Sequence, residues 1–155
     1  PGPAWGLLQA GQDALLDDGT VLHAAAFRQT ETQRATVVIG GDNDTPALLT
    51  DACAGAQLLV HEATYTEAML HKVGPGPTHS SVQRVAQFAE AVRLPNLILT
   101  HFSARYHNAD GMAELEAEAR QHYSGELFLA RDFDSYELDA AGVLSKLPAK
   151  KSSGD

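Results

Sequence analysis

Four short segments of the chain carry carboxylate and imidazole side chains, the groups that hold metal ions and move protons near neutral pH. The segments are Gly40-Gly41-Asp42, His61-Glu62-Ala63-Thr64, Thr78-His79-Ser80-Ser81 and Thr100-His101-Phe102-Ser103. Three of them adjoin the expected end of a strand or helix, where a folded scaffold brings polar side chains together. The pattern predicts part of a two-metal hydrolytic site, with the other part absent from these 155 residues.

Asp42 and His101 stand where a metal ligand is expected. Asp42 follows an apolar run and two glycines, which allow the backbone to approach a metal ion or a substrate closely. Alternatively, this carboxylate begins the loop and helps to cap the next helix. His101 ends another apolar run, and its neutral imidazole suits Zn²⁺ or Mn²⁺. Its alternative role is a hydrogen bond within the strand-to-loop turn, and the local sequence leaves both pairs of interpretations open.

A second group of residues suits proton transfer and phosphate binding. Glu62 and His79 could form an acid–base pair in which the carboxylate orients the imidazole. His79 precedes an expected helix N-terminus, which favours anions, although the ring could instead pack against the neighbouring Pro-Gly loop. Ser103 and Arg105 follow in a loop, where arginine suits bidentate recognition of phosphate or a surface ion pair. His61 precedes Glu62 in the same strand, so its side chain is expected to point to the opposite face and to have a structural role.

Alternating strand and helix patterns would position these residues. In open α/β sheets, ligands collect at the carboxyl ends of the strands, and three apolar runs of this chain end in a charged or imidazole residue. The sequence therefore predicts an α/β fold. The expected strands are Thr20–His23, Ala35–Ile39, Gln57–His61, Asn96–Thr100, Glu126–Ala130 and Phe133–Leu138. The runs at 35–39 and 96–100 are expected to be buried strands.

Helices are expected between these strands. One begins at Thr45, with Pro46 at its first position and Gly55 after its end. Another begins at a capping box formed by Ser80 and Gln83, and a third spans about 110 to 122. Other expectations are a short helix or loop over about 64–72, a loop over 28–34, an irregular segment over 1–18 anchored by Trp5, Leu7 and Leu8, and one buried helix face made of Val82, Val85, Ala86 and Ala89.

Length and composition set broad limits on the class of protein. The chain has 155 residues, 44% hydrophobic and 20% charged, which fits one domain of ordinary composition. No apolar run reaches the length of a membrane span. The single cysteine, Cys53, rules out an intramolecular disulfide, fits a reducing cytosol and is expected in the core. The net charge of −9 gives no basic footprint for nucleic acid.

Taken together, these segments resemble the ribonuclease Z family of the metallo-β-lactamase superfamily, the transfer-RNA 3′-processing endonucleases. The resemblance extends from Pro1 to about Leu138 and depends most on His-Glu-Ala-Thr at 61–64 and His-Ser-Ser at 79–81. It implies the C-terminal half of a four-layer αβ/βα sandwich. That half would span residues 1–148, followed by a disordered tail over 149–155.

The resemblance also implies roles for individual residues. Asp42 would bridge two divalent metal ions, with Zn²⁺ the first expectation and Mn²⁺ the alternative, and His101 would be the last histidine ligand. Glu62 and His79 would donate a proton to the leaving 3′ oxygen during endonucleolytic removal of the 3′ trailer from precursor tRNA.

Partners follow from the same resemblance. Ser103 and Arg105 would contact the scissile phosphate of precursor tRNA. The chain would also require the N-terminal half of the fold and would form a homodimer in the cytoplasm, away from membranes.

The chain departs from the family pattern in ways that keep other functions open. It lacks the His-x-His-x-Asp-His metal motif, so only two of seven expected ligands are present, and Gly41-Asp42-Asn43 replaces the usual Gly-Asp-Thr. One alternative is a small-molecule phosphodiesterase or hydrolase of the same superfamily. Another is a non-catalytic half-domain that acts as a scaffold.

Overall fold

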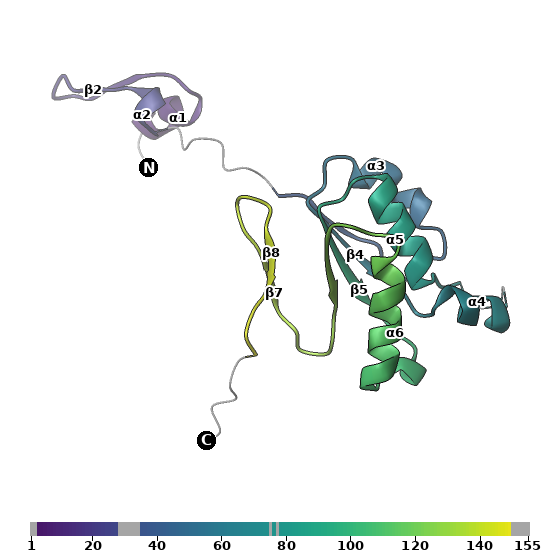
Figure 1. Cartoon of the computed structure of the whole chain (residues 1–155). Helices are drawn as coiled ribbons and strands as arrows, with labels where there is room; N and C mark the ends of the chain where they lie inside the picture. The colour runs from purple at the N-terminus through teal and green to yellow at the C-terminus, as the bar shows by residue number, and fades with distance from the viewer. Residues whose placement is uncertain (1–2, 28–34, 75, 77, 150–155) are drawn as a thin grey trace. The chain divides into compact units, whose positions relative to one another are not determined.

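The computed structural model describes residues 3–27, 35–74, 76 and 78–149 (Figure 1). The chain forms two compact units, an N-terminal unit (Pro1–Arg34) and a sheet unit (Ala35–Asp155), each described here by itself. The loop predicted over 28–34 and, apart from Ala149, the predicted tail lie outside the described residues. Within the described ranges, no helix is long and apolar enough to cross a membrane.

The N-terminal unit contains more regular structure than the sequence predicted. Helix α1 (Pro3–Gln9) replaces the irregular start, and the short antiparallel strands β1 (Ala14–Leu15) and β2 (Val21–Leu22) lead to helix α2 (Ala24–Phe27). Leu8 is buried with Ala14 and Ala24, whereas Trp5 and Leu7 are 49% and 41% exposed. Only one of the three predicted anchors is therefore buried within this unit.

The sheet unit is built on four parallel strands, which confirms the α/β class. Their order is β3-β4-β5-β6, and the two central strands are almost wholly buried, as apolar runs without alternation predict. In the edge strand β3, Val38 packs against the helical core, whereas Val37 and Ile39 point to the opposite face and are 45% and 68% exposed. The prediction of a buried strand there was wrong. The strands are β3 (Val37–Ile39), β4 (Leu58–Glu62), β5 (Asn96–Thr100) and β6 (Glu126–Leu129).

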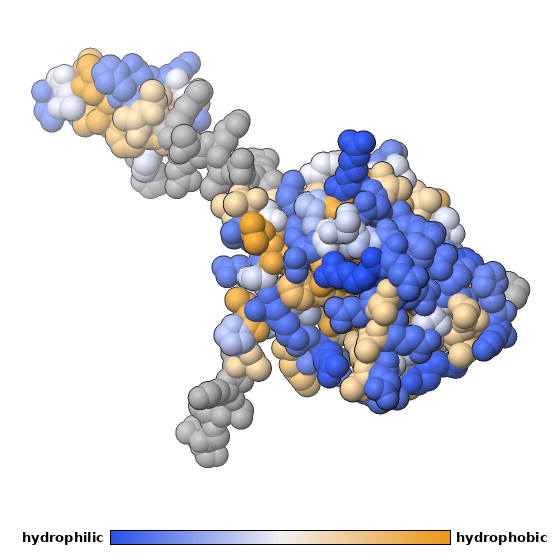
Figure 2. Space-filling view, in the orientation of Figure 1, coloured by the Kyte–Doolittle hydropathy of each residue, from blue (hydrophilic) through white to orange (hydrophobic). Residues whose placement is uncertain are grey.

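Helices cover one face of this sheet. The buried helix face predicted at 82, 85, 86 and 89 packs on Leu59, Leu97 and Leu99, and Leu115 of the last helix joins the same core. Figure 1 shows α5 and α6 together on this side, and the surface over them is mainly hydrophilic in Figure 2. The segments are η1 (Pro46–Leu49), α3 (Thr50–Cys53), α4 (Glu67–Val73), α5 (Val82–Ala91), η2 (Ala104–Tyr106) and α6 (Ala109–Arg120).

A hairpin of β7 (Tyr136–Leu138) and β8 (Leu144–Lys146) packs on the opposite face of the sheet. Strand β8 was not predicted, and β7 is shorter than the run predicted from Phe133, which is fully exposed. Successive side chains of a strand point to opposite faces, so Leu58 and Ile98 lie on the face away from the helices. Leu144 of the hairpin is buried against these two residues. The Asn96 side chain donates hydrogen bonds to the carbonyls of Gln57 and Gly142, which join the hairpin turn to the sheet.

Two helix starts differ from the sequence predictions. Ser81, not Ser80, is the N-cap of α5, where its hydroxyl accepts from the Arg84 amide at 3.2 Å. The buried Ser80 hydroxyl instead donates to the Asn43 carbonyl at 2.7 Å. Thr45 precedes a 3₁₀ turn and makes no side-chain cap hydrogen bond. Capping motifs thus located the helices to within a residue, while tertiary contacts decided which hydroxyl serves as the cap.

Candidate metal centre

Loops at the carboxyl ends of β3, β4 and β5 bring the predicted site residues to one edge of the sheet. Asp42 follows β3, Glu62 is the last residue of β4, and His101 follows β5. His79 reaches the same edge from the segment before α5. The strands are parallel and adjacent in the sheet, so their ends lie side by side, which is the usual position of ligands in open α/β sheets.

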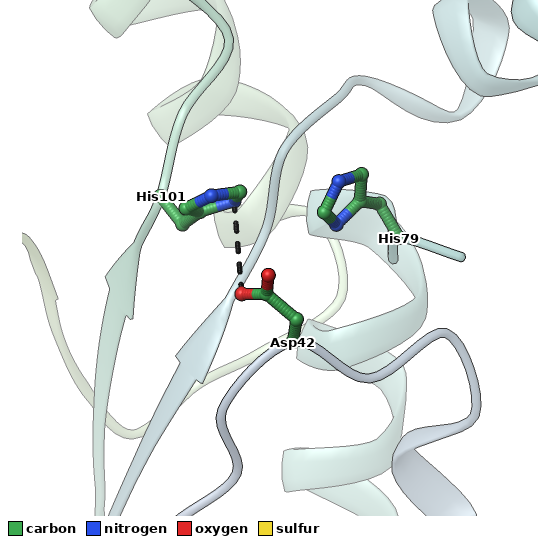
Figure 3. A group of neighbouring side chains, drawn as sticks. All are labelled: Asp42, His79 and His101. Carbon is green, nitrogen blue, oxygen red and sulfur yellow. Dashed lines mark ion pairs between the residues drawn. The ribbon is translucent and has the colours of Figure 1, made fainter. Parts of the chain in front are cut away.

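Asp42, His79 and His101 form a cluster with the composition of a metal site (Figure 3). One ligand atom from each residue lies within 4.8 Å of the other two. Nδ1 of His101 is 4.0 Å from Oδ1 of Asp42, and the two imidazole centroids are 5.0 Å apart. Two imidazoles and one carboxylate suit Zn²⁺ and also other divalent transition metals. The structure brings His79 into this cluster, whereas the sequence assigned it to proton transfer alone.

The His79 ring supplies a direct test of whether the cluster fits a metal ion. Its Nδ1 atom is buried and has no hydrogen-bond partner among the residues that the structure describes. Buried polar atoms in native proteins almost always have a partner. The nearest charged group is the Glu62 carboxylate, whose Oε1 lies 3.7 Å from Nδ1. The residues present fit a cation site, because a carboxylate and two imidazoles meet at one point beside the buried Glu62 carboxylate.

His101 is held in an uncommon backbone conformation. Its φ angle is +57°, a left-handed value that few residues other than glycine adopt. Such conformations cost about 1–3 kcal/mol and persist where surrounding contacts hold them, often at functional sites. Here the backbone turns sharply at the end of β5, which directs the imidazole toward Asp42.

Glu62 is a buried carboxylate at the centre of the site. It is 2% exposed, and its Oε2 accepts hydrogen bonds from the backbone and the hydroxyl of Thr64 at 2.9 and 2.8 Å. Its Oε1 accepts from the Ser80 amide. The Ser80 hydroxyl also donates to the Asn43 carbonyl. Ser80 therefore links Glu62 and the segment that carries His79 to the loop that carries Asp42. Glu62 and His79 therefore lie close together, as predicted, with Glu62 buried and His79 next to Asp42 and His101.

Thr64 is the site residue that the sequence reasoning missed. Its buried hydroxyl lies 2.9 Å from Nδ1 of His101 as well as beside Glu62. The only signal for it was its place in the His-Glu-Ala-Thr segment, two residues after the carboxylate.

Ser103 and Arg105 lie together but outside the cluster. The Nε atom of Arg105 donates to the Ser103 hydroxyl at 3.1 Å, and its guanidinium lies 5.6 Å from the Tyr65 ring centroid. The Tyr65 ring in turn meets His79 edge-on at 6.3 Å. Arg105 makes no ion pair with any residue that the structure describes, so the surface ion pair considered from the sequence is not found there. Its role in phosphate binding stays a prediction.

His61 and Gly40 form the support beneath the Asp42 loop. His61 is 1% exposed, and its Nδ1 lies 2.6 Å from the Glu62 carbonyl, in keeping with the structural role expected of it. Gly40 donates its amide to the Val60 carbonyl at 2.8 Å and passes so close to the imidazole that a Cβ would lie 2.5 Å from Cδ2 of His61. The absence of a side chain at Gly40 therefore allows the loop to approach the sheet.

Gly40→Ala is expected to destabilise the protein by about 1–3 kcal/mol, because the rigid, buried imidazole cannot move away from the added methyl group. The shift should also displace Asp42 and weaken metal binding. Urea denaturation would measure the stability. Gly6→Ala in α1 is the matched control, since nothing lies within 4 Å of its added Cβ. Equal stability of the two variants would contradict the close contact.

Glu67 joins α4 to the beginning of α5. Its carboxylate accepts from Arg84 Nε at 3.0 Å and Nη2 at 2.8 Å, and also from the Ser81 hydroxyl. The hydrogen bond from the Arg84 side chain is the largest cause that holds the pKa of Glu67 below its ordinary value of 4.5. This network lies directly after the His79-Ser80 segment and holds the start of α5 in place.

The Glu67 network predicts a pH dependence of stability. A carboxyl whose pKa is lowered by folding stabilises the folded state above its unfolded pKa, and the contribution is lost as pH falls through the folded pKa. We therefore expect Glu67→Gln to lose about 1.5–3 kcal/mol at pH 7 and to respond less than the wild type to acid below pH 4.5. Unfolding in urea between pH 7 and pH 3 would measure both effects. Glu116→Gln, exposed on α6, should follow the wild type throughout.

Comparison with known proteins defines the class. A metallo-β-lactamase fold protein, YhfI from Bacillus subtilis, superposes with a TM-score of 0.54 over 72% of this chain and 39% of its own, at 21% identity. No family model matches the chain. The parallel sheet and the helical layer are those of a metallo-β-lactamase-like α/β fold.

Sequence relatives define the family more narrowly. Ribonuclease Z of Marinobacter nauticus is 54% identical over 95% of this chain and 47% of its own length. Ribonuclease Z of Pseudomonas putida is 42% identical over 92% of this chain, and that of Haloferax volcanii is 36% identical over 90%. These similarities confirm the resemblance to the ribonuclease Z family. The chain spans about half the length of the curated relatives it matches.

Proposed function

We propose that the protein containing this chain is a metal-dependent endoribonuclease that removes the 3′ trailer from precursor tRNA. The observation that carries the proposal is the convergence of Asp42, His79 and His101 beside the buried Glu62. This convergence occurs in a chain that is 54% identical to a ribonuclease Z over 95% of the chain and 47% of that relative. The extent of the half-domain, residues 1–148, belongs to the same proposal.

Asp42 and His101 are the metal ligands in this proposal. Asp42 is exposed and its carboxylate can bridge two cations, while His101 offers one imidazole nitrogen to the same point. Zn²⁺ suits this donor set best, and Mn²⁺ accepts the same ligands. When bound, such ions polarise a phosphoryl oxygen and lower the pKa of a water molecule. The remaining ligands would come from the N-terminal half of the fold, outside this chain.

Glu62 and His79 act as a pair in this proposal, in which His79 donates a proton to the leaving group and Glu62 orients its ring. Hydrolysis breaks the bond between phosphorus and the 3′ oxygen, and that oxygen must take up one proton to leave as a 3′ hydroxyl. The attacking water supplies the oxygen that joins the phosphate of the trailer. His79 is partly exposed beside the cluster, and Oε1 of Glu62 lies 3.7 Å from its Nδ1, where the carboxylate can orient the ring for proton transfer.

The substrate and partners follow from the same roles. Arg105, whose Nε donates to the Ser103 hydroxyl and whose guanidinium lies 5.6 Å from the Tyr65 ring centroid, is the cation that would bind the scissile phosphate. With a net charge of −9, the chain offers no broad basic surface, so most tRNA contacts would come from the other half of the protein. We place the enzyme in the cytoplasm as a homodimer.

The test is metal content and cleavage by the full chain that the gene encodes. We expect about two bound ions per protomer by elemental analysis and release of the 3′ trailer from precursor tRNA. Asp42→Ala should lose both metal and cleavage, whereas Asp51→Ala, exposed on α3, should retain both.

Other outcomes of this test favour other functions. Cleavage of a chromogenic phosphodiester but not of precursor tRNA would favour a small-molecule phosphodiesterase. A folded protein without bound metal would favour a non-catalytic scaffold.

A further inference from the structure

We propose that Thr64 is a positioning residue that couples the Glu62 carboxylate to the His101 ring and decides which ring nitrogen of His101 carries the proton. The inference deepens the proposed function and depends on it for the presence of the metal. The Thr64 hydroxyl contacts two site residues, Glu62 and His101. Nothing about Thr64 as a residue type indicates this role, which comes from its contacts alone.

The Thr64 hydroxyl lies between the carboxylate and the imidazole. Its Oγ1 is 2.8 Å from Oε2 of Glu62, 2.9 Å from Nδ1 of His101 and 3.0 Å from the His101 carbonyl oxygen. Thr64 and Glu62 are 5% and 2% exposed, so water cannot readily replace these contacts. The hydroxyl is therefore shared among three partners in a buried position.

Counting protons decides the direction of these hydrogen bonds. A threonine hydroxyl has one proton to donate and two lone pairs that accept. The other partners of Glu62 are the amides of Thr64 and Ser80, both donors, so its two oxygens act as acceptors. The shortest contact of the hydroxyl is to Oε2, and a hydrogen bond to a carboxylate is stronger than one to a neutral acceptor. The Thr64 proton accordingly points to Glu62.

The proton on the His101 ring follows from this assignment. Because Oγ1 of Thr64 uses its one proton in the hydrogen bond to Glu62, it can only accept a hydrogen bond from Nδ1 of His101. A neutral imidazole carries one proton, so its Nε2 has the free lone pair that a metal ion requires. Metal-bound histidines commonly donate their other nitrogen in this way, which fixes the tautomer and the ring orientation.

The backbone holds Thr64 and His101 in register. The Ala63 amide donates to the Thr100 carbonyl at 2.9 Å, and the Ser103 amide donates to the Thr64 carbonyl at 3.0 Å. These two bonds join the loops after β4 and β5 on either side of the hydroxyl. The left-handed backbone at His101 then places its ring against Oγ1. Thr64 is thus positioned by the sheet rather than by its own local sequence.

The experiment compares Thr64→Val with Thr64→Ser in the full chain that the gene encodes. Valine keeps the shape of threonine but removes the hydroxyl, whereas serine keeps the hydroxyl. Competition with a chromogenic chelator would give the Zn²⁺ affinity without any assay of activity. We expect Thr64→Val to bind Zn²⁺ roughly 10- to 100-fold more weakly than the wild type and Thr64→Ser to bind within a few-fold of it.

Thr66→Val is the matched control. Thr66 is also buried, but its hydroxyl contacts the Tyr106 hydroxyl and caps α4 by accepting from the Met69 amide. We expect its thermal midpoint to fall while its Zn²⁺ affinity stays at the wild-type value. Loss of affinity in Thr64→Val but not in Thr66→Val separates positioning of the ligand from general loss of stability.

Long-range ¹H–¹⁵N spectra of the metal-free protein test the tautomer independently. The wild type should show His101, assigned by its absence in His101→Gln, with the proton on Nδ1, and Thr64→Val should lose this preference. A wild-type ring protonated on Nε2, or unchanged Zn²⁺ affinity in Thr64→Val, would overturn the inference. A protein that binds Zn²⁺ as expected but cleaves no precursor tRNA contradicts the proposed function and leaves the role of Thr64 standing.

Discussion

Glu62→Gln, in the full chain that the gene encodes, is expected to cleave precursor tRNA at least about 100-fold more slowly than the wild type. The neutral amide cannot replace the carboxylate whose Oε1 lies 3.7 Å from Nδ1 of His79 and orients that ring for proton transfer. It also presents an NH₂ group where the carboxylate accepted from Thr64 or from Ser80. One buried donor is then left facing another donor, which should cost about 1–3 kcal/mol of stability.

Two measurements separate the catalytic effect of Glu62→Gln from its structural effect. Single-turnover cleavage well below the unfolding temperature gives the rate, and urea denaturation gives the stability. His79→Ala should slow cleavage to a similar extent with a smaller loss of stability, since its ring is partly exposed and has fewer partners. The double variant should be no slower than either single variant, because the two residues act as one unit.

Glu137→Gln on β7 is the control for the Glu62 prediction. This side chain is exposed, so the same substitution should leave both rate and stability near the wild-type values. If Glu62→Gln retained its cleavage rate while the protein stayed folded, the proposed proton-donor pair would be wrong.

Leu99→Ala is expected to lower the free energy of unfolding by about 2–5 kcal/mol. Leu99 lies in the central strand β5, is wholly buried and packs under the helical layer, so the smaller side chain leaves a cavity. The strand delivers His101, and the substitution should also weaken Zn²⁺ binding. Urea denaturation and chelator competition would measure the two effects.

Leu48→Ala is the matched control for the core prediction. Leu48 is 78% exposed in η1, so removing the same atoms should change stability by less than about 0.5 kcal/mol. Similar losses in the two leucine variants would show that the helix-covered face of the sheet is not the main core.

Much of the site could be predicted because its residues occupy recognisable places in the chain. Asp42 and His101 follow apolar runs that become β3 and β5, and parallel strands bring such ends together. The apolar face of α5 was predicted residue by residue and is buried throughout. Periodicity carries this information, since it reflects which side of an element faces the core.

Other features were outside the reach of the sequence. Burial of β3 was predicted from its apolar composition, but the composition does not show that Val37 and Ile39 lie on the face away from the helical core, where they are exposed. Strand β8 is a three-residue segment that forms only because β7 and the outer sheet face provide partners. The serine that caps α5 changed by one residue because the Ser80 hydroxyl has a tertiary partner, the Asn43 carbonyl.

The sequence by itself determined the α/β class, the relation to the ribonuclease Z family and the segments that carry the site, because hydrophobic periodicity and motif residues are local properties. Only the tertiary structure decided that His79 joins Asp42 and His101, and that the Thr64 hydroxyl joins Glu62 to the His101 ring. These contacts join residues up to 37 positions apart in the chain. Their geometry depends on strand order and loop conformation, which no single segment specifies.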